Sequence, residues 1–178
     1  MRVNARIDLR IDPEPPDSQL VGELLERYYA ELDSRFPSGF DLALTVAAPA
    51  AELTPPLGLM LVARLDARAV GCGGVRRLEA NAAEIKRMWI DPSARGLGIG
   101  RRLLVALELA AAELGCDTVR LDTAAALTEA RALYQGAGYR EIAPYNDNPY
   151  AAHWFEKRLA LAGRTGQWIG PPPRGRVA

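Results

Sequence analysis

The part of the chain best suited to chemistry is a glycine-rich turn at the start of a long helical pattern. Residues 95–102 read Arg-Gly-Leu-Gly-Ile-Gly-Arg-Arg and follow an apolar run that ends at Ile90. The first turn of a helix leaves about four backbone N–H groups without intrahelical partners, and such groups bind anions. Glycines let a ligand approach the backbone, and the arginines add positive charge. The turn is therefore predicted to bind a diphosphate.

Two common phosphate-binding motifs do not fit this turn. No Gly-Lys-Ser/Thr sequence is present, which excludes a P-loop. The glycines at 96, 98 and 100 lack the G-x-G-x-x-G spacing. The dinucleotide fold also expects the turn directly after the first strand of a parallel unit. The remaining alternative is a glycine-rich helix start that binds nothing.

Hydrophobic periodicity indicates the elements that position the turn. Strands are predicted at 6–11, 57–65, 69–78, 82–90, 118–123, 139–142 and 152–157. Helices are predicted at 17–33, capped by Asp17 or Ser18, at 96–114, ended by Gly115, and at 128–137, capped by Thr128. A loop with a short helical turn is predicted over 36–56. This order predicts a mixed α/β sheet, antiparallel at first, with a parallel pair where the 96–114 helix joins two strands.

The pattern Arg95-x-x-Gly98-x-Gly100 resembles the R/Q-x-x-G-x-G/A signature of the GNAT superfamily of acyl-coenzyme A N-acyltransferases. Residues 84–92, Glu-Ile-Lys-Arg-Met-Trp-Ile-Asp-Pro, resemble the fourth strand of that family. Residues 121–123 resemble its fifth strand, and 130–139 its Y-x-x-x-G-[FY] segment. The resemblance extends from about residue 57 to 157.

The resemblance implies a splayed mixed sheet of about seven strands, flanked by about four helices and open between the fourth and fifth strands. It implies that acetyl-coenzyme A is the acyl donor, its pantetheine arm beside the fourth strand and its diphosphate on the turn. No metal is expected. The residues expected to contact the cofactor are Met88, Trp89, Ile90, Arg95, Gly96, Leu97, Gly98, Ile99, Gly100, Arg101 and Thr123.

Acyl transfer to an amine requires a base, because an alkyl ammonium has a pKa near ~10.4. In the matching position Glu84 is the candidate base, directly or through water; the alternative is a strand carboxylate paired with Lys86 or Arg87. Tyr134 matches the family tyrosine beside the thioester sulfur. Full proton transfer from a phenol to a thiolate is uphill by roughly 2 kcal/mol, so we expect Tyr134 to donate a hydrogen bond. The alternative is a core tyrosine. A backbone N–H near Trp89 is expected to meet the oxyanion.

The acceptor is expected to contact Tyr145, Asn148 and Tyr150, in a polar loop whose alternative role is an ordinary turn. Phe40, in the 35–40 segment, is expected to line the cleft from the opposite side. His153 is the only histidine and falls in the strand that borders the acceptor cleft in the family. Its alternative is a solvated or structural histidine.

Composition limits the classes of partner. The 178 residues carry 22 basic and 22 acidic side chains, so no net charge attracts nucleic acid or an anionic membrane. Two distant cysteines and one histidine do not make a conventional zinc site, and both thiols are expected to be free and buried. With no leader or membrane-span pattern, we expect a cytoplasmic location.

The sequence predicts one acyltransferase domain over 1–162 and a Pro/Gly-rich, mobile tail over 163–178. The leading hypothesis is transfer of an acetyl group to the amine of a small-molecule or amino-acid-like acceptor in a ternary complex. A non-catalytic acyl-coenzyme A sensor and a protein N-acetyltransferase are the alternatives. The acceptor, the acyl length and the oligomeric state, including a homodimer, stay open.

Overall fold

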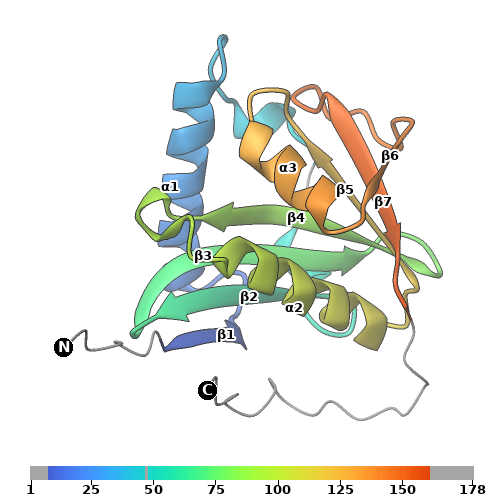
Figure 1. Ribbon diagram of the computed structural model, residues 1–178, viewed down its shortest axis with the longest axis horizontal. Helices are drawn as coiled ribbons and strands as arrows, with labels where there is room; N and C mark the ends of the chain where they lie inside the picture. Colours follow the sequence, from blue (N-terminus) through green and yellow to red (C-terminus); the bar gives the residue numbers. More distant parts are fainter. Residues whose placement is uncertain (1–7, 47, 161–178) are drawn as a thin grey trace.

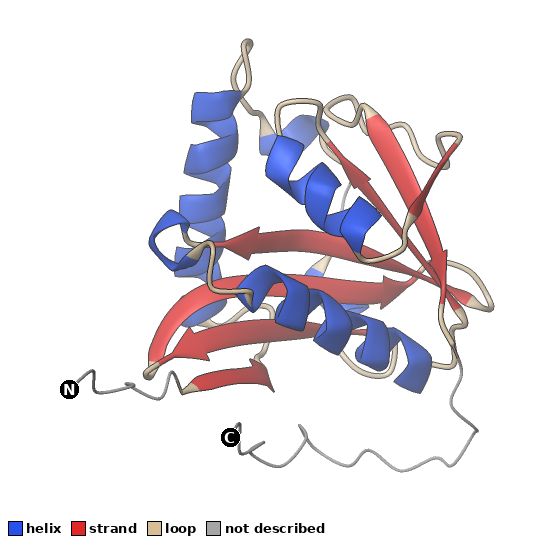
Figure 2. Ribbon diagram, in the orientation of Figure 1, coloured by secondary structure: helices blue, strands red, loops and turns tan. Residues whose placement is uncertain are grey.

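The computed structural model describes residues 8–46 and 48–160, which form one seven-stranded sheet with helices on both faces (Figures 1 and 2). The strand order is β1-β2-β3-β4-β5-β7-β6. The strands are β1 (Leu9–Pro13), β2 (Gly58–Leu65), β3 (Arg68–Arg77), β4 (Ala82–Ile90), β5 (Thr118–Thr123), β6 (Arg140–Ile142) and β7 (His153–Arg158). The α-helices are α1 (Gln19–Arg35), α2 (Ile99–Glu113) and α3 (Thr128–Gly136). Short 3₁₀ helices span Leu42–Leu44, Ala50–Leu53 and Pro92–Ala94.

The sheet opens between β4 and β5, the predicted parallel pair. These strands pair only at one end, where Ala82–Glu84 lies opposite Thr118–Arg120. Beyond Glu84 the two strands diverge, and Figure 1 shows the resulting V between them. The β3–β4 register shifts by one residue near Gly73, and Arg87 in this shift has a φ of 56°. A bulge of this kind bends a strand, so it contributes to the divergence.

The helices cover opposite faces of the β1–β4 half. Helix α2 packs on one face through apolar residues such as Leu103, Leu104 and Leu107, which join the larger core cluster. Helix α1 packs on the other face through Val21 and Leu24. Helix α3 lies on the α2 side, beside β5 and β7 (Figure 1). The described chain therefore has a core on each side of the sheet, with the open V between its two halves.

Several sequence predictions are confirmed. Both β4 and β5 have the predicted bounds. Ser18 caps α1 by accepting a hydrogen bond from the backbone N–H of Val21 at 3.2 Å. Gly115 follows α2 with a φ of 83°, as expected for a residue just past a helix end. Both cysteines are free and buried.

Other predictions need correction. Three α-helices lie in residues 8–46 and 48–160, where about four were expected. Helix α2 begins at Ile99, not Gly96, because Gly96 and Gly98 have φ values of 78° and 73°, which no right-handed helix accommodates. Thr128 is not the cap of α3 but its first residue, and no side chain caps the helix start at Leu127. Strand β1 begins at Leu9, and residues 6 and 7 lie outside the described ranges.

The predicted tail over 163–178 also lies outside the described residues. In the part that is described, no helix has both the length and the apolar character needed to span a bilayer.

Candidate active site

The glycine-rich turn borders a cavity of about 360 Å³ between the open half of β4, α1, α3 and the start of α2. No atom lies within 4 Å of a Cβ built on Gly96 or Gly98, so the turn presents its backbone to open space. The predicted cofactor residues that line this cavity are Met88, Trp89, Ile90, Arg95, Gly96, Gly98, Ile99, Gly100 and Arg101. Leu97 does not line it and is 49% exposed. Thr123 lines a second cavity instead.

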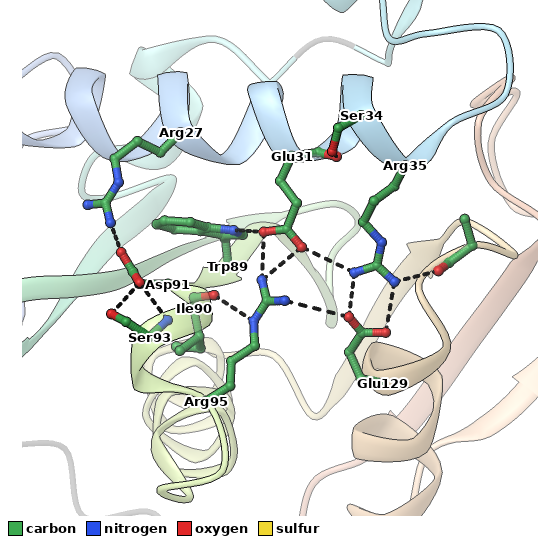
Figure 3. Close-up of polar contacts among 11 residues, drawn as sticks. Arg27, Glu31, Ser34, Arg35, Trp89, Ile90, Asp91, Ser93, Arg95 and Glu129 are labelled. Atoms are coloured by element: carbon green, nitrogen blue, oxygen red, sulfur yellow. Dashed lines mark hydrogen bonds and ion pairs between the residues drawn. The ribbon is translucent and has the colours of Figure 1, made fainter.

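The guanidinium of Arg95 does not project freely from the turn but joins a polar network (Figure 3). It donates to both carboxylate oxygens of Glu31 on α1, at 2.9 and 2.6 Å, and lies 3.7 Å from Glu129 on α3. Arg35 contacts Glu31 and Glu129 as well. The indole N–H of Trp89 donates to Glu31 at 2.8 Å. These alternating charges, which we call the α1–α3 network, connect α1 to α3 across the cavity that the turn borders.

The network lowers the pKa values of its carboxyl groups. Hydrogen bonds from Arg35 are the main cause for Glu129, whose pKa falls to about 2. Burial alone would raise the pKa of Glu31, but hydrogen bonds from Arg95, Trp89 and Arg35 outweigh it and the pKa is lowered. Both carboxylates are therefore ionised at neutral pH.

A second cavity, of about 410 Å³, adjoins the first and is lined by residues 85–88 of β4. Five aromatic rings form a contiguous wall, which we call the aromatic wall: Tyr28, Tyr29, Phe36, Phe40 and Tyr150. Neighbouring centroids are 5.1 to 5.5 Å apart along this chain of rings. The hydroxyl of Tyr150 accepts a 2.8 Å hydrogen bond from the backbone N–H of Asp41. This bond fixes the loop of residues 144–150, which we call the late loop, against the segment after α1.

Polar side chains from β4, β5 and the late loop line the same cavity. Asp122 on β5 accepts hydrogen bonds from Asn148 at 2.7 Å and from Asn146 at 2.8 Å. Lys86 lies 3.4 Å from Asp122. Lys86 and Arg87 are adjacent on β4, yet both line this cavity because the bulge interrupts the strand alternation.

The two cavities meet at side chains common to both linings, including Tyr28, Met88 and Tyr134. The hydroxyl of Tyr134 lies 4.0 Å from the sulfur of Met88. Burial, with a smaller effect of the Asp122 charge, raises the pKa of Tyr134. The phenol therefore stays protonated at neutral pH and can act as a hydrogen-bond donor at the junction.

Glu84 lies in the closed half of β4, fully buried and lining neither cavity. Arg76 bonds one of its oxygens through two nitrogens, at 2.8 and 2.7 Å. The other oxygen receives contacts from Tyr145 at 3.0 Å, Asn146 at 3.4 Å and Lys86 at 3.5 Å. These contacts match the alternative predicted from the sequence, a paired strand carboxylate, with Arg76 as the principal partner.

The predicted acceptor residues divide into two groups. Phe40, Asn148 and Tyr150 line the second cavity. Tyr145 does not, and donates its hydroxyl to Glu84 instead. His153 also lies outside both linings, and its Nδ1 is 2.6 Å from a carboxylate oxygen of Glu141. This placement of His153 corresponds to its structural alternative.

The comparisons with known proteins agree with this geometry. The profile of the Acetyltransferase (GNAT) family matches residues 21–139. The chain belongs to this family. An IAA acetyltransferase of Azospirillum brasilense is 32% identical over 156 residues, 85% of this chain and 99% of that protein. A Klebsiella pneumoniae structure assigned to the acyl-CoA N-acyltransferases is 31% identical, with a TM-score of 0.69 over 88% of this chain and 99% of its own. A GNAT acetyltransferase of Elizabethkingia anophelis, solved with acetyl-CoA bound, shares the fold at 16% identity and a TM-score of 0.57, over 85% of this chain and 98% of its own.

In this GNAT chain, sequence reasoning missed several residues that line the cavities. Asp122 lines the second cavity but is not among the predicted site residues, although a carboxylate in an apolar strand is a signal of function. Tyr28 and the adjacent Tyr29 on α1 also line the second cavity and are not among the predicted site residues. Arg87 was treated only as a partner for Glu84, but its guanidinium donates to the backbone carbonyl of Ala48 at 2.9 Å.

Proposed function

We propose that this protein transfers an acetyl group from acetyl-coenzyme A to the amine of a small molecule. The observation that carries the proposal is the junction of two cavities at Tyr134. The first cavity, which we call the cofactor-side cavity, has an open glycine turn suited to a diphosphate. The second, which we call the acceptor-side cavity, has a carboxylate suited to an ammonium. The residues fit the cofactor because the turn leaves room for its phosphates and the open edge of β4 leaves room for its pantetheine arm.

The size of the acceptor-side cavity favours a small acceptor. Its volume of about 410 Å³ is near the lower end of the range for small-molecule sites, roughly 300–1,000 Å³. The aromatic wall is formed by α1, the segment after it and the late loop, so these elements enclose the acceptor. A protein N-acetyltransferase would need an open groove for the chain that follows the acetylated residue.

We propose Asp122, in place of Glu84, as the group that receives the acceptor ammonium. A carboxylate has about four lone-pair positions. Asp122 lines the cavity and has three donors, from Asn146, Asn148 and Lys86, so one position stays open for the ammonium. Glu84 already has five donor contacts and lines neither cavity. Glu84 then acts as a positioning residue, since it holds Lys86 and Asn146 beside Asp122.

Asp122 accepts the ammonium proton that must leave before the nitrogen can attack. The amine nitrogen then attacks the thioester carbonyl carbon, the C–N bond forms and the C–S bond breaks, with the electron pair retained by sulfur. Tyr134 donates a hydrogen bond to the departing thiolate, which then takes up a proton from solvent, while the second nitrogen proton passes to solvent. The raised pKa of Tyr134 fits a donor role better than full proton transfer.

Thiol release from acetyl-coenzyme A, measured across a panel of amines, tests the proposal. Release that depends on the amine, with an N-acetylated product seen by mass spectrometry, would support it. Saturable binding of acetyl-coenzyme A in calorimetry without release by any amine would contradict it and favour the non-catalytic sensor. Acetylation of peptides with no acetylation of free amines would contradict the small-molecule acceptor.

A further inference from the structure

Lys86 and Arg87 both line the acceptor-side cavity, but only Lys86 has an acidic partner there. Arg76 pairs with Glu84, Lys86 with Asp122, and Arg95 with Glu31. Among the described residues, no carboxylate lies within 4 Å of Arg87, and its guanidinium donates only to the carbonyl of Ala48. A guanidinium has five N–H donors, so most of the donors of Arg87 are left without a protein acceptor in the described chain.

The backbone directs this cation into the acceptor-side cavity. The φ of 56° at Arg87 is unusual for a non-glycine residue. It lies in the bulge that brings Lys86 and Arg87 to the same cavity. Arg87 and Tyr29 line the same cavity, and the charge of Arg87 opposes the effect of burial, which raises the pKa of Tyr29. A half-buried cation with open donors, beside apolar rings, is suited to a carboxylate that carries an apolar group.

Three features of different chemistry therefore surround one cavity. Asp122 presents a carboxylate with an open position, Arg87 presents a guanidinium, and the aromatic wall presents ring faces and edges. The five rings are only partly buried in the protein, although each lines the cavity. A flat apolar ligand group would bury more of their surface and gain ring-to-ring contact.

We infer that the acceptor is a small amino carboxylate with an aromatic body. Its carboxylate binds Arg87, its ammonium binds Asp122, and its ring packs on the aromatic wall near Tyr29 and Phe40. The inference rests on the proposed acetyl transfer for the reaction, but the binding of the carboxylate does not depend on it. Arg87 is thus a specificity-determining residue that selects amines with a carboxylate over amines without one.

A matched pair of acceptors, L-phenylalanine and 2-phenylethylamine, tests the role of the carboxylate. The two share the ring and the amine and differ in the carboxylate. We expect the wild-type kcat/KM for L-phenylalanine to exceed that for 2-phenylethylamine at least about tenfold, since a bond to a charged group has this magnitude. Arg87→Met should remove the difference by lowering kcat/KM for L-phenylalanine alone. Equal use of both amines by the wild type, or an equal loss for both in the variant, would overturn the inference.

Binding of 3-phenylpropanoate, which has no amine to acetylate, separates this inference from the proposed function. Calorimetry should show saturable binding that weakens at least about tenfold in Arg87→Met. Arg10→Met, which removes an exposed cation on β1, should leave the affinity unchanged. Binding that depends on Arg87, without thiol release by any amine, would support the inference and contradict the proposed function. Binding that does not depend on Arg87, with both variants folded by circular dichroism, would overturn the inference.

Discussion

The two cavities are built in different ways. The cofactor-side cavity takes most of its lining from one continuous segment, the end of β4 and the turn that leads into α2. The acceptor-side cavity takes its lining from α1, the segment after it, β4, β5, α3 and the late loop. One presents mainly backbone and small residues at the turn, while the other presents aromatic and charged side chains. A ligand common to a family can be held by main chain, whereas selection among acceptors requires side chains from several elements.

The comparison predicts that a single change of side chain at the turn is enough to prevent cofactor binding. Gly98 has a φ of 73°, which is strained for other residues, and its Cβ position faces the open cavity. Gly98→Glu should weaken acetyl-coenzyme A binding at least roughly a hundredfold, because backbone strain adds to repulsion of the diphosphate. Isothermal titration calorimetry measures the loss.

Val105→Glu is the matched control for this change. It adds the same carboxylate to α2 at a position that is 47% exposed and lines neither cavity. Its cofactor affinity should equal that of the wild type. Retained affinity in Gly98→Glu would show that the diphosphate lies elsewhere.

The acceptor-side cavity makes a contrasting prediction for its two carboxylates. Asp122→Asn should lower kcat/KM for the amine roughly a hundredfold, the usual scale for loss of a base, with little change in cofactor affinity. Glu84→Gln should instead lower the free energy of unfolding by about 3 kcal/mol, because it breaks the buried pair with Arg76. Urea denaturation and steady-state kinetics on both variants separate the two effects. The opposite assignment, with Glu84→Gln fully stable and inactive, would restore Glu84 as the base.

A change at the junction of the cavities should lower kcat without changing the affinity for acetyl-coenzyme A. Tyr134→Phe removes the hydrogen bond to the departing thiolate, so kcat should fall roughly tenfold while the Kd for acetyl-coenzyme A stays the same. Tyr139 is a buried tyrosine whose ring lies 5.9 Å from that of Tyr134, and it lines neither cavity. Tyr139→Phe is the control and should keep kcat. Equal turnover in wild type and Tyr134→Phe would remove this phenol from the mechanism.

The sequence indicated correctly those elements whose residues are adjacent in the chain. The turn from Arg95 to Arg101 and the bounds of β4 and β5 follow from glycines and apolar runs that are adjacent in the chain. The predicted start of helix α2 is three residues too early, because the positive φ values of Gly96 and Gly98 are a property of the folded backbone. Glu84 is predicted as the base from its match to the family. Its pairing with Arg76 is not part of that prediction, because Arg76 comes from the neighbouring strand β3.

The sequence indicates only part of the acceptor-side cavity, namely Phe40, Asn148 and Tyr150, because the parts of this cavity are far apart in the chain. Tyr29 and Tyr150 belong to one wall only after α1 and the late loop meet. Arg87 reaches the cavity because of a bulge, and a bulge leaves no reliable trace in an apolar pattern. The same limitation applies to the α1–α3 network, whose carboxylates at 31 and 129 are nearly a hundred residues apart.

The α1–α3 network should produce the smallest effect, and one that depends on pH. The pKa of Glu129 is about 2 in the folded protein against an ordinary value of 4.5. A lowered pKa means that the stabilisation is present above pH 4.5 and is lost as the pH falls towards 2. The side chain of Glu129 is 50% exposed, so the contribution is below about 1 kcal/mol. Urea denaturation of wild type and Glu129→Gln should give a small difference at pH 7 that shrinks steadily between pH 4.5 and 2.

Glu26→Gln, an exposed change on α1, is the control and should follow the wild type over the same range. A wild-type advantage over Glu129→Gln that stays constant from pH 7 to pH 2 would contradict the lowered pKa, because a protonated Glu129 no longer carries the charge that Arg35 pairs with. An advantage that disappears already near pH 4.5 would place the folded-state pKa at its ordinary value.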